Sequence, residues 1–167
     1  KERPVPAKLT KPAITTAAPD VTPQPRNVDQ LVAQVKSSAK GRSLLIVEDD
    51  VGFTKALEES SRAHGFNPVT VGDGETALEL LKEHTPAAIL LDVKLPGVSG
   101  MSVLESIKKN SSLRHVPIHM MSALDYQVPA MRLGAIGYLD KPVSIDGIKG
   151  AFEKIEKLLD KQVKQVL

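Results

Sequence analysis

Carboxylates directly follow two apolar stretches of the chain. Glu48, Asp49 and Asp50 come after the run SLLIV, and Asp92 comes after AAILL. Carboxylates held close together repel one another, and this repulsion raises a pKa unless a cation offsets the charge. A hard divalent cation with oxygen ligands, such as Mg²⁺, is the natural partner. The sequence therefore predicts a magnesium site where these two groups meet.

A hydroxyl group and an ammonium group follow two later apolar stretches. Ser122 comes after PIHMM, and Lys141 stands between Asp140 and Pro142 after a run that ends at Leu139. Packing alone does not require polar residues at these places. A lysine and a hydroxyl opposite a metal suit a phosphoryl group held between the metal and the ammonium. The four polar groups together predict phosphoryl chemistry.

The apolar stretches alternate with segments of helical periodicity. Five such units within about 120 residues predict an α/β fold, with a parallel sheet and helices on both of its faces. Ligands of such sheets bind just beyond the carboxyl ends of the strands, where the four polar groups would gather. We expect strands at 43–47, 69–71, 87–93, 117–121 and 136–139, and helices at about 51–64, 77–85, 101–109 and 129–133 and from 144 onward.

Composition and charge exclude several classes of function. The 167 residues carry Lys+Arg 22 against Asp+Glu 20, a net charge of +2, which argues against a nucleic-acid coat. Cys is 0, so disulfides, thiolate zinc sites and cysteine nucleophiles are excluded. Trp is 0 and aromatic residues are 3%, so stacking platforms for bases are not expected. No apolar run approaches the ~20 residues that span a bilayer.

These exclusions set expectations for partners and location. We expect no nucleic-acid partner and no membrane contact by this fragment. The first residues do not resemble a signal peptide, and the absence of Cys fits a reducing compartment. The expected location is cytoplasmic.

The N-terminal part of the chain differs in composition from the rest. Residues 1–41 hold 6 of the 12 Pro and 7 Lys/Arg against 3 Asp/Glu, a local net charge of +4. We interpret this part as a Pro-rich basic linker. Within it, apolar residues recur at helical spacing, which predicts a short helix near 28–37 with Asn27 at its N-cap. So short a helix is marginal alone and must dock on something or fray.

Four motifs in order carry a resemblance to a known family. They are LLIVEDD (44–50), LLDVKLPGVSG (90–100), MMSA (120–123) and GYLDKPV (137–143), each at the end of an expected strand. Residues 42–160 resemble the receiver domain of two-component response regulators. The resemblance implies a five-stranded parallel sheet of order 2-1-3-4-5 with helices on both faces, the flavodoxin-like receiver fold.

The resemblance also implies roles at the metal site. Asp92 matches the phospho-accepting aspartate, and Glu48 and Asp49 match the acidic pair that arranges Mg²⁺. Asp49 is the expected direct ligand, and Glu48 acts through water. Lys94 falls where the family supplies a backbone carbonyl to the metal.

Three further residues match positions that contact or sense the phosphoryl group. Ser122 resembles the hydroxyl residue that bonds the phosphoryl group, and Lys141 resembles the lysine that balances its charge. Tyr138 falls where the family has an aromatic rotamer switch, although plain half-buried packing is the alternative for this residue. Ser122 and Tyr138 together would form the switch.

The function implied is Mg²⁺-dependent transfer of a phosphoryl group from a phosphohistidine donor to Asp92, which switches a protein-interaction surface. The donor would be a histidine kinase or a histidine phosphotransfer domain, and the receiver of the signal a downstream protein or an adjacent domain. Such a domain assists its own phosphorylation and dephosphorylation but is not a conventional enzyme. The alternative is a receiver-like scaffold that binds a partner protein and is not phosphorylated.

Two enzyme classes of similar topology are disfavoured. A haloacid-dehalogenase-type phosphatase needs a second Asp two residues after its nucleophile, and Lys94 occupies that position. A flavodoxin-like electron carrier needs a Ser/Thr/Gly-rich phosphate loop after the first strand, where this chain reads EDDVGF. Within that stretch, we expect Asp50 to cap the following helix.

The chain departs from the family pattern in three places. Glu48 replaces the commoner Asp, and Val143 stands where a Phe often follows Lys-Pro. Lys141 follows Ser122 by 19 positions, about one helical turn fewer than usual. We therefore expect a short or irregular fourth helix, in the part of the domain that usually forms the output and dimer face.

The end of the chain has two interpretations. The residues KQVL (164–167) resemble the opening of another first strand, as in GRSLL (41–45). On this interpretation residues 161–167 start a following module, and the fragment comes from a hybrid sensor histidine kinase. The alternative is a C-terminal extension in which the last helix runs on to Leu167.

Overall fold

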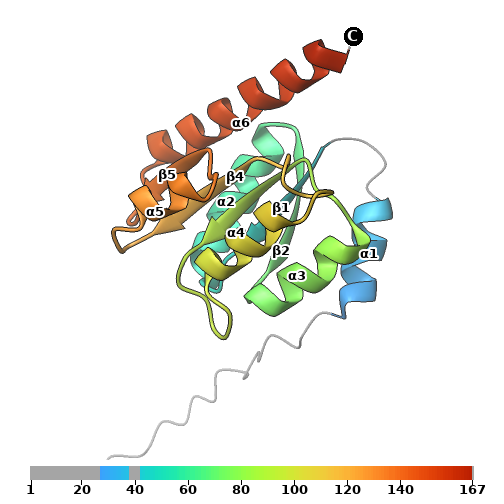
Figure 1. Ribbon diagram of the computed structural model, residues 1–167, viewed down its shortest axis with the longest axis horizontal. Helices are drawn as coiled ribbons and strands as arrows, with labels where there is room; N and C mark the ends of the chain where they lie inside the picture. Colours follow the sequence, from blue (N-terminus) through green and yellow to red (C-terminus); the bar gives the residue numbers. More distant parts are fainter. Residues whose placement is uncertain (1–26, 38–41, 167) are drawn as a thin grey trace, which may run out of the picture.

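The computed structural model describes residues 27–37 and 42–166, and its core is a five-stranded parallel sheet of order β2-β1-β3-β4-β5 (Figure 1). This result confirms the predicted fold class and strand order. The strands are β1 (Arg42–Val47), β2 (Phe66–Val71), β3 (Ala88–Asp92), β4 (Ile118–Ser122) and β5 (Gly137–Asp140), and the helices are α1 (Val28–Ser37), α2 (Val51–Ala63), α3 (Gly74–Glu83), α4 (Gly100–Lys109), α5 (Gln127–Arg132) and α6 (Ile145–Val166).

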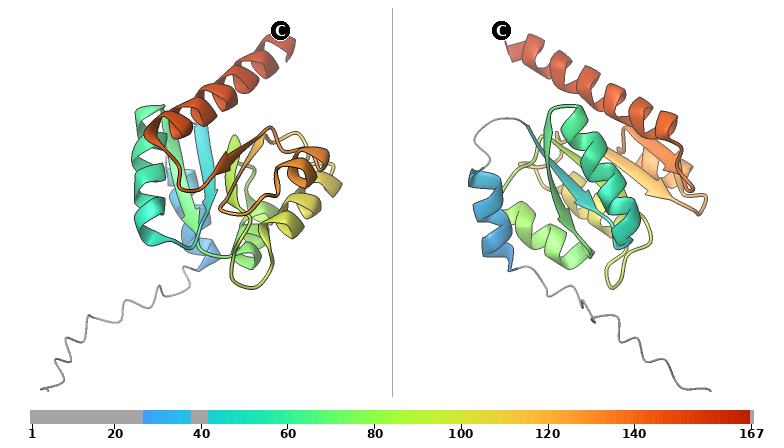
Figure 2. Two further views of the ribbon diagram at one scale, coloured as in Figure 1. Left: turned by 90° about the vertical axis from the view of Figure 1, so that its left-hand side faces the viewer. Right: turned by 180° about the vertical axis from the view of Figure 1, so that it is seen from behind.

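Helices cover both faces of the sheet (Figure 2). One apolar core lies between the sheet and α2 with α6, and includes Leu57 and Phe152. The other lies under α1, α3 and α4, and includes Leu80 and Leu104. The central strands β3 and β4 are buried along their whole length, as strands covered on both faces must be.

The edge strand β2 is longer than the sequence predicts. Pro68 lies within it, opposite Leu44 of β1. Proline cannot donate a backbone hydrogen bond, and it is tolerated in edge strands. Because β2 pairs only with β1, the strand begins before Pro68 rather than after it.

The short helix expected near 28–37 is α1, which docks beside α3 at the β2 edge of the sheet (Figure 1). Asn27 begins it, and its Oδ1 accepts a hydrogen bond from the backbone N–H of Asp29 at 3.1 Å. Leu31 is 1% exposed within the apolar core. The rest of the predicted linker, residues 1–26 and 38–41, lies outside the described residues.

The last two helices differ in length. α5 has only 6 residues, which confirms the expected short fourth helix of the domain. α6 has 22 residues and extends past the sheet (Figure 1). Residues 164–166 continue this helix, and residue 167 lies outside the described residues. Among the described residues, no helix combines the length and apolar character needed to cross a bilayer.

Candidate functional site

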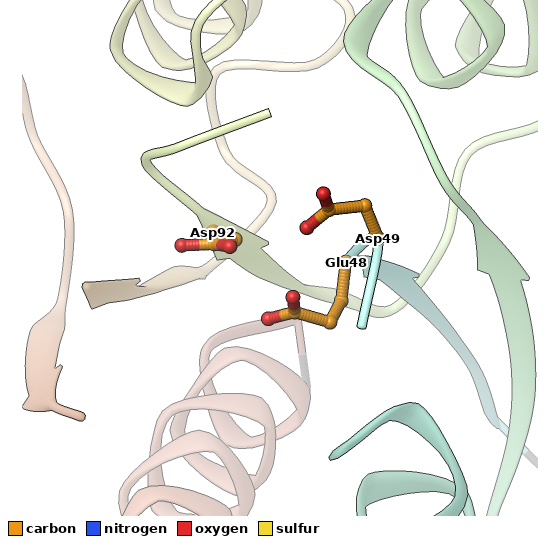
Figure 3. A group of neighbouring side chains, drawn as sticks. All are labelled: Glu48, Asp49 and Asp92. Carbon is orange, nitrogen blue, oxygen red and sulfur yellow. The ribbon is translucent and has the colours of Figure 1, made fainter. Parts of the chain in front are cut away.

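The carboxylates predicted to bind a metal lie together at the carboxyl ends of β1 and β3 (Figure 3). Single oxygens of Glu48, Asp49 and Asp92 all lie within 4.8 Å of one another. Glu48 and Asp92 are buried, whereas Asp49 is exposed. The parallel register of β1 and β3 brings these carboxylates together. Val47 pairs with Leu91, so the residues that follow them lie at the same edge of the sheet.

The third member of the EDD motif has a separate role. Asp50 is the N-cap of α2, and its Oδ1 accepts a hydrogen bond from the backbone N–H of Phe53 at 2.9 Å. This confirms its expected capping role, in which a carboxylate satisfies a free N–H at the helix start. The cap also fixes where α2 begins, at Val51.

Lys141 connects the two buried carboxylates. Its Nζ donates to Glu48 Oε2 at 2.6 Å and to Asp92 Oδ2 at 3.0 Å. The same Nζ lies 4.9 Å from the centre of the Phe53 ring, within range of a cation–π interaction. Burial works to lower the pKa of Lys141, but hydrogen bonds and charge attraction from both carboxylates outweigh it and leave the pKa raised.

Glu48 has a strongly raised pKa. Burial, aided by the nearby charge of Asp92, raises its pKa to about 7, against the opposing hydrogen bonds from Lys141 and the backbone N–H of Asp50. One ammonium group therefore does not fully compensate the carboxylates. A further cation would fit here, and the donors are all oxygens, the set that Mg²⁺ prefers.

Ser122 and Tyr138 are connected through the loop that follows β4. The buried Ser122 Oγ accepts from the backbone N–H of Leu124 at 2.9 Å. The Tyr138 hydroxyl donates to the carbonyl of Leu124 and accepts from the N–H of Tyr126. The N–H of Lys141 donates to the Ser122 carbonyl at 2.9 Å, so the site lysine and the site serine share a backbone hydrogen bond.

Comparison with known proteins identifies the family. The family model of the response regulator receiver domain matches residues 44–153. This chain is a member of the response regulator receiver domain family.

Individual relatives agree with this assignment. The receiver is 34% identical over 107 residues to the polar-differentiation response regulator DivK of Brucella anthropi, covering 62% of this chain and 87% of the relative. A receiver domain of a sensor histidine kinase from Pseudomonas aeruginosa, solved with magnesium coordinated in its active-site cleft, is 26% identical with a TM-score of 0.63, covering 72% of this chain and 98% of that one. A receiver domain protein from Clostridium thermocellum shares the fold at 23% identity, with a TM-score of 0.65, covering 75% of this chain and 99% of that one.

The family assignment establishes the general role of the chain. It is a receiver domain of two-component signalling, and receiver domains bind Mg²⁺ in an acidic pocket and interact with histidine kinases or phosphotransfer proteins. In this chain, Glu48, Asp49 and Asp92 form an acidic cluster.

The backbone after Asp92 also belongs to the site. The N–H of Lys94 donates to Asp92 Oδ1 at 3.3 Å, and the Lys94 side chain is exposed. The loop from Val93 to Ser99 closes on itself, because the N–H of Gly100 donates to the Val93 carbonyl at 2.8 Å.

Sequence reasoning missed the importance of Gly100. A Cβ at this residue would collide with the backbone carbonyl of Asp92, so only glycine allows α4 to begin so close to Asp92. The available signal was the second glycine of PGVSG, which lies one residue ahead of the helix expected at 101–109.

Proposed function

We propose that Asp92 accepts the phosphoryl group in this receiver and that Asp49, Asp92 and the Lys94 carbonyl hold Mg²⁺ directly, with Glu48 acting through water. The observation that carries the proposal is the convergence of three carboxylates, two of which also bond the ammonium group of Lys141. Two buried carboxylates bonded to one half-buried lysine are not readily explained by a purely structural role, because burial of such ions costs stability.

The chemistry needs few groups. An oxygen of the Asp92 carboxylate forms a bond to the phosphorus of a phosphohistidine, the P–N bond breaks, and the imidazole leaves with its electron pair. Such transfer proceeds through a loose transition state, so the protein contributes position and charge rather than covalent chemistry. Lys141 offsets negative charge on the transferred group. When bound, Mg²⁺ supplies further compensation for the carboxylate and phosphoryl oxygens.

We also propose that Ser122 and Tyr138 form the switch. A phosphoryl group on Asp92 attracts the Ser122 hydroxyl, which must then give up its hydrogen bond from Leu124. The loop that carries Leu124 is also held by the Tyr138 hydroxyl. Release of one contact changes the other, so a local change in charge biases the packing of the β4–α5 loop.

The proposed partners follow from this chemistry. The donor is a histidine kinase or a histidine phosphotransfer domain, and the recipient is a downstream protein or an adjacent domain. The proposed location is the cytoplasm, supported by a composition without Cys.

The test is phosphorylation of the full chain with acetyl phosphate and Mg²⁺, followed by intact-mass measurement. We expect one phosphoryl group on the wild type, none on Asp92→Asn and none when EDTA replaces Mg²⁺. Asp50→Asn is the matched control, since this carboxylate caps α2. No adduct on the wild type, or an adduct that persists in Asp92→Asn, would favour a scaffold that is not phosphorylated.

A further inference from the structure

The loop between β3 and α4 is held from outside by the first turn of α3. This loop follows Asp92 and contains Lys94, whose carbonyl is a proposed metal ligand. The Oε1 atom of Glu75, in α3, accepts a hydrogen bond from the backbone N–H of Val98 at 3.1 Å. The contact joins residues 23 positions apart in the sequence, so α3 and the loop are fixed to each other by tertiary structure.

Two glycines make this contact possible. Gly97 has φ +73, a conformation that favours glycine, and a Cβ there would collide with the Glu75 carboxylate. Gly74, the first residue of α3, would place a Cβ 2.8 Å from the Val98 carbonyl. The loop backbone is therefore packed directly against the start of α3, without intervening side chains.

The start of α3 is itself rigidly defined. Asp73 caps the helix, with its Oδ1 accepting from the N–H of Thr76 at 2.7 Å and its Oδ2 accepting from the Thr76 hydroxyl at 2.9 Å. A capped first turn keeps the carboxylate of Glu75 at a fixed place relative to the loop. At its other end, the loop is closed by the hydrogen bond from Gly100 to Val93.

We propose that Glu75 is a positioning residue for the metal site, because it holds the loop that presents the Lys94 carbonyl. The proposal rests on the proposed function, in which this carbonyl is a metal ligand. Glu75 is exposed and does not belong to the acidic cluster, so its role is to hold the loop and not to bind the ion. Groups that orient ligands in this way typically contribute about tenfold or more to metal affinity.

The experiment compares Mg²⁺ affinity, by isothermal titration calorimetry on the full chain, among the wild type, Glu75→Ala, Glu75→Gln and Glu79→Ala. We expect Glu75→Ala to raise the dissociation constant about tenfold. Glu75→Gln keeps an oxygen acceptor for the Val98 N–H and should bind nearly as the wild type does. Glu79 is one turn further along α3 and pairs with Lys82 at 2.7 Å, so its removal changes the charge equally without touching the loop.

Each result has a distinct meaning. Glu75→Ala with wild-type affinity overturns the proposal, and so does Glu75→Gln with a loss equal to that of Glu75→Ala, since that loss would come from charge alone. Failure of the wild type to bind Mg²⁺ overturns the proposed function itself. Hydrogen exchange of the Val98 amide, measured without added metal, gives a second test. Its exchange rate should increase in Glu75→Ala and stay at the wild-type value in Glu75→Gln.

Discussion

A single ammonium group joins the two buried carboxylates of the site: Lys141 Nζ lies 2.6 Å from Glu48 Oε2 and 3.0 Å from Asp92 Oδ2. The lysine comes from the end of β5 and the carboxylates from the ends of β1 and β3, so the contact spans most of the width of the sheet. In the absence of metal, this ammonium is the main compensation for their charge.

Replacement of Lys141 by Met should therefore destabilise the metal-free protein. It leaves two buried carboxylates without a counter-charge, at a cost of about 3 kcal/mol in the free energy of unfolding. Added Mg²⁺ should restore part of this loss, since an ion that binds only the folded state stabilises it. Urea denaturation in EDTA and in Mg²⁺ measures both effects. Lys82→Met, at an exposed ion pair, is the control, and an equal loss in both variants would contradict the prediction.

Mg²⁺ binding should weaken as the pH falls below about 7, the pKa to which burial raises Glu48. Below this pH a proton occupies the carboxylate and competes with the cation. The metal-free protein should show the opposite trend: between pH 4.5 and 7 the folded state binds more protons at Glu48 than the unfolded state, so this residue's contribution to stability falls as the pH rises.

Calorimetric titration of Mg²⁺ between pH 6 and 8, with Glu48→Gln alongside, measures the first of these effects. The variant should bind Mg²⁺ more weakly at pH 8 and with a flatter pH dependence. If wild type and variant show the same slope, the titrating group is not Glu48.

Acid should destabilise the protein through His119, a buried residue of β4. Burial lowers its pKa to about 4, and its Nδ1–H donates to the Met120 carbonyl at 3.2 Å. Between pH 6.5 and 4 the unfolded state binds a proton at His119 that the folded state does not. The free energy of unfolding therefore decreases as the pH is lowered, by at most about 3 kcal/mol.

His119→Gln should remove most of this pH dependence, measured as urea midpoints between pH 4 and 7. His115→Gln, at an exposed position, should keep the wild-type profile. A wild-type profile in His119→Gln would place the acid sensitivity elsewhere.

Removal of the Leu31 side chain should destabilise the whole domain and not α1 alone. Leu31 is 1% exposed within the core shared with α3, and truncation of a buried leucine costs about 2–5 kcal/mol. Gln30→Ala, on the exposed side of the same helix, should have little effect. Thermal and urea unfolding of Leu31→Ala should remain a single transition at lower stability. A wild-type midpoint for Leu31→Ala would mean that α1 is not part of the folding unit.

The sequence indicated which polar side chains would meet, because β1, β3, β4 and β5 are short and each ends in, or is directly followed by, a polar residue. Asp92 and Lys141 are far apart in the chain, yet a parallel sheet brings the ends of β3 and β5 to the same edge. The capping role of Asp50 was also predictable, since a carboxylate before a helix has a local function.

Features that depend on tertiary contacts were not predictable in the same way. Periodicity predicted α1, but nothing in residues 28–37 indicates that Leu31 packs beside α3. The hydrogen bond between Glu75 and Val98 joins two residues far apart in the chain, and neither has a local pattern that indicates the contact. The requirement for glycine at residue 100 comes from the nearby carbonyl of Asp92, which only the folded structure places there. Close backbone approach has no local pattern in the sequence.

The docking of α1 has a mechanical consequence. Residues 28–37 lie ahead of the stretch that the family model matches, yet they are anchored to the same helix whose first turn holds the loop after Asp92. A force applied to the chain ahead of Val28 would be transmitted to α3 through the packing of α1 against it. Helix α3 would in this way connect motion upstream of the domain with the loop beside the acidic cluster.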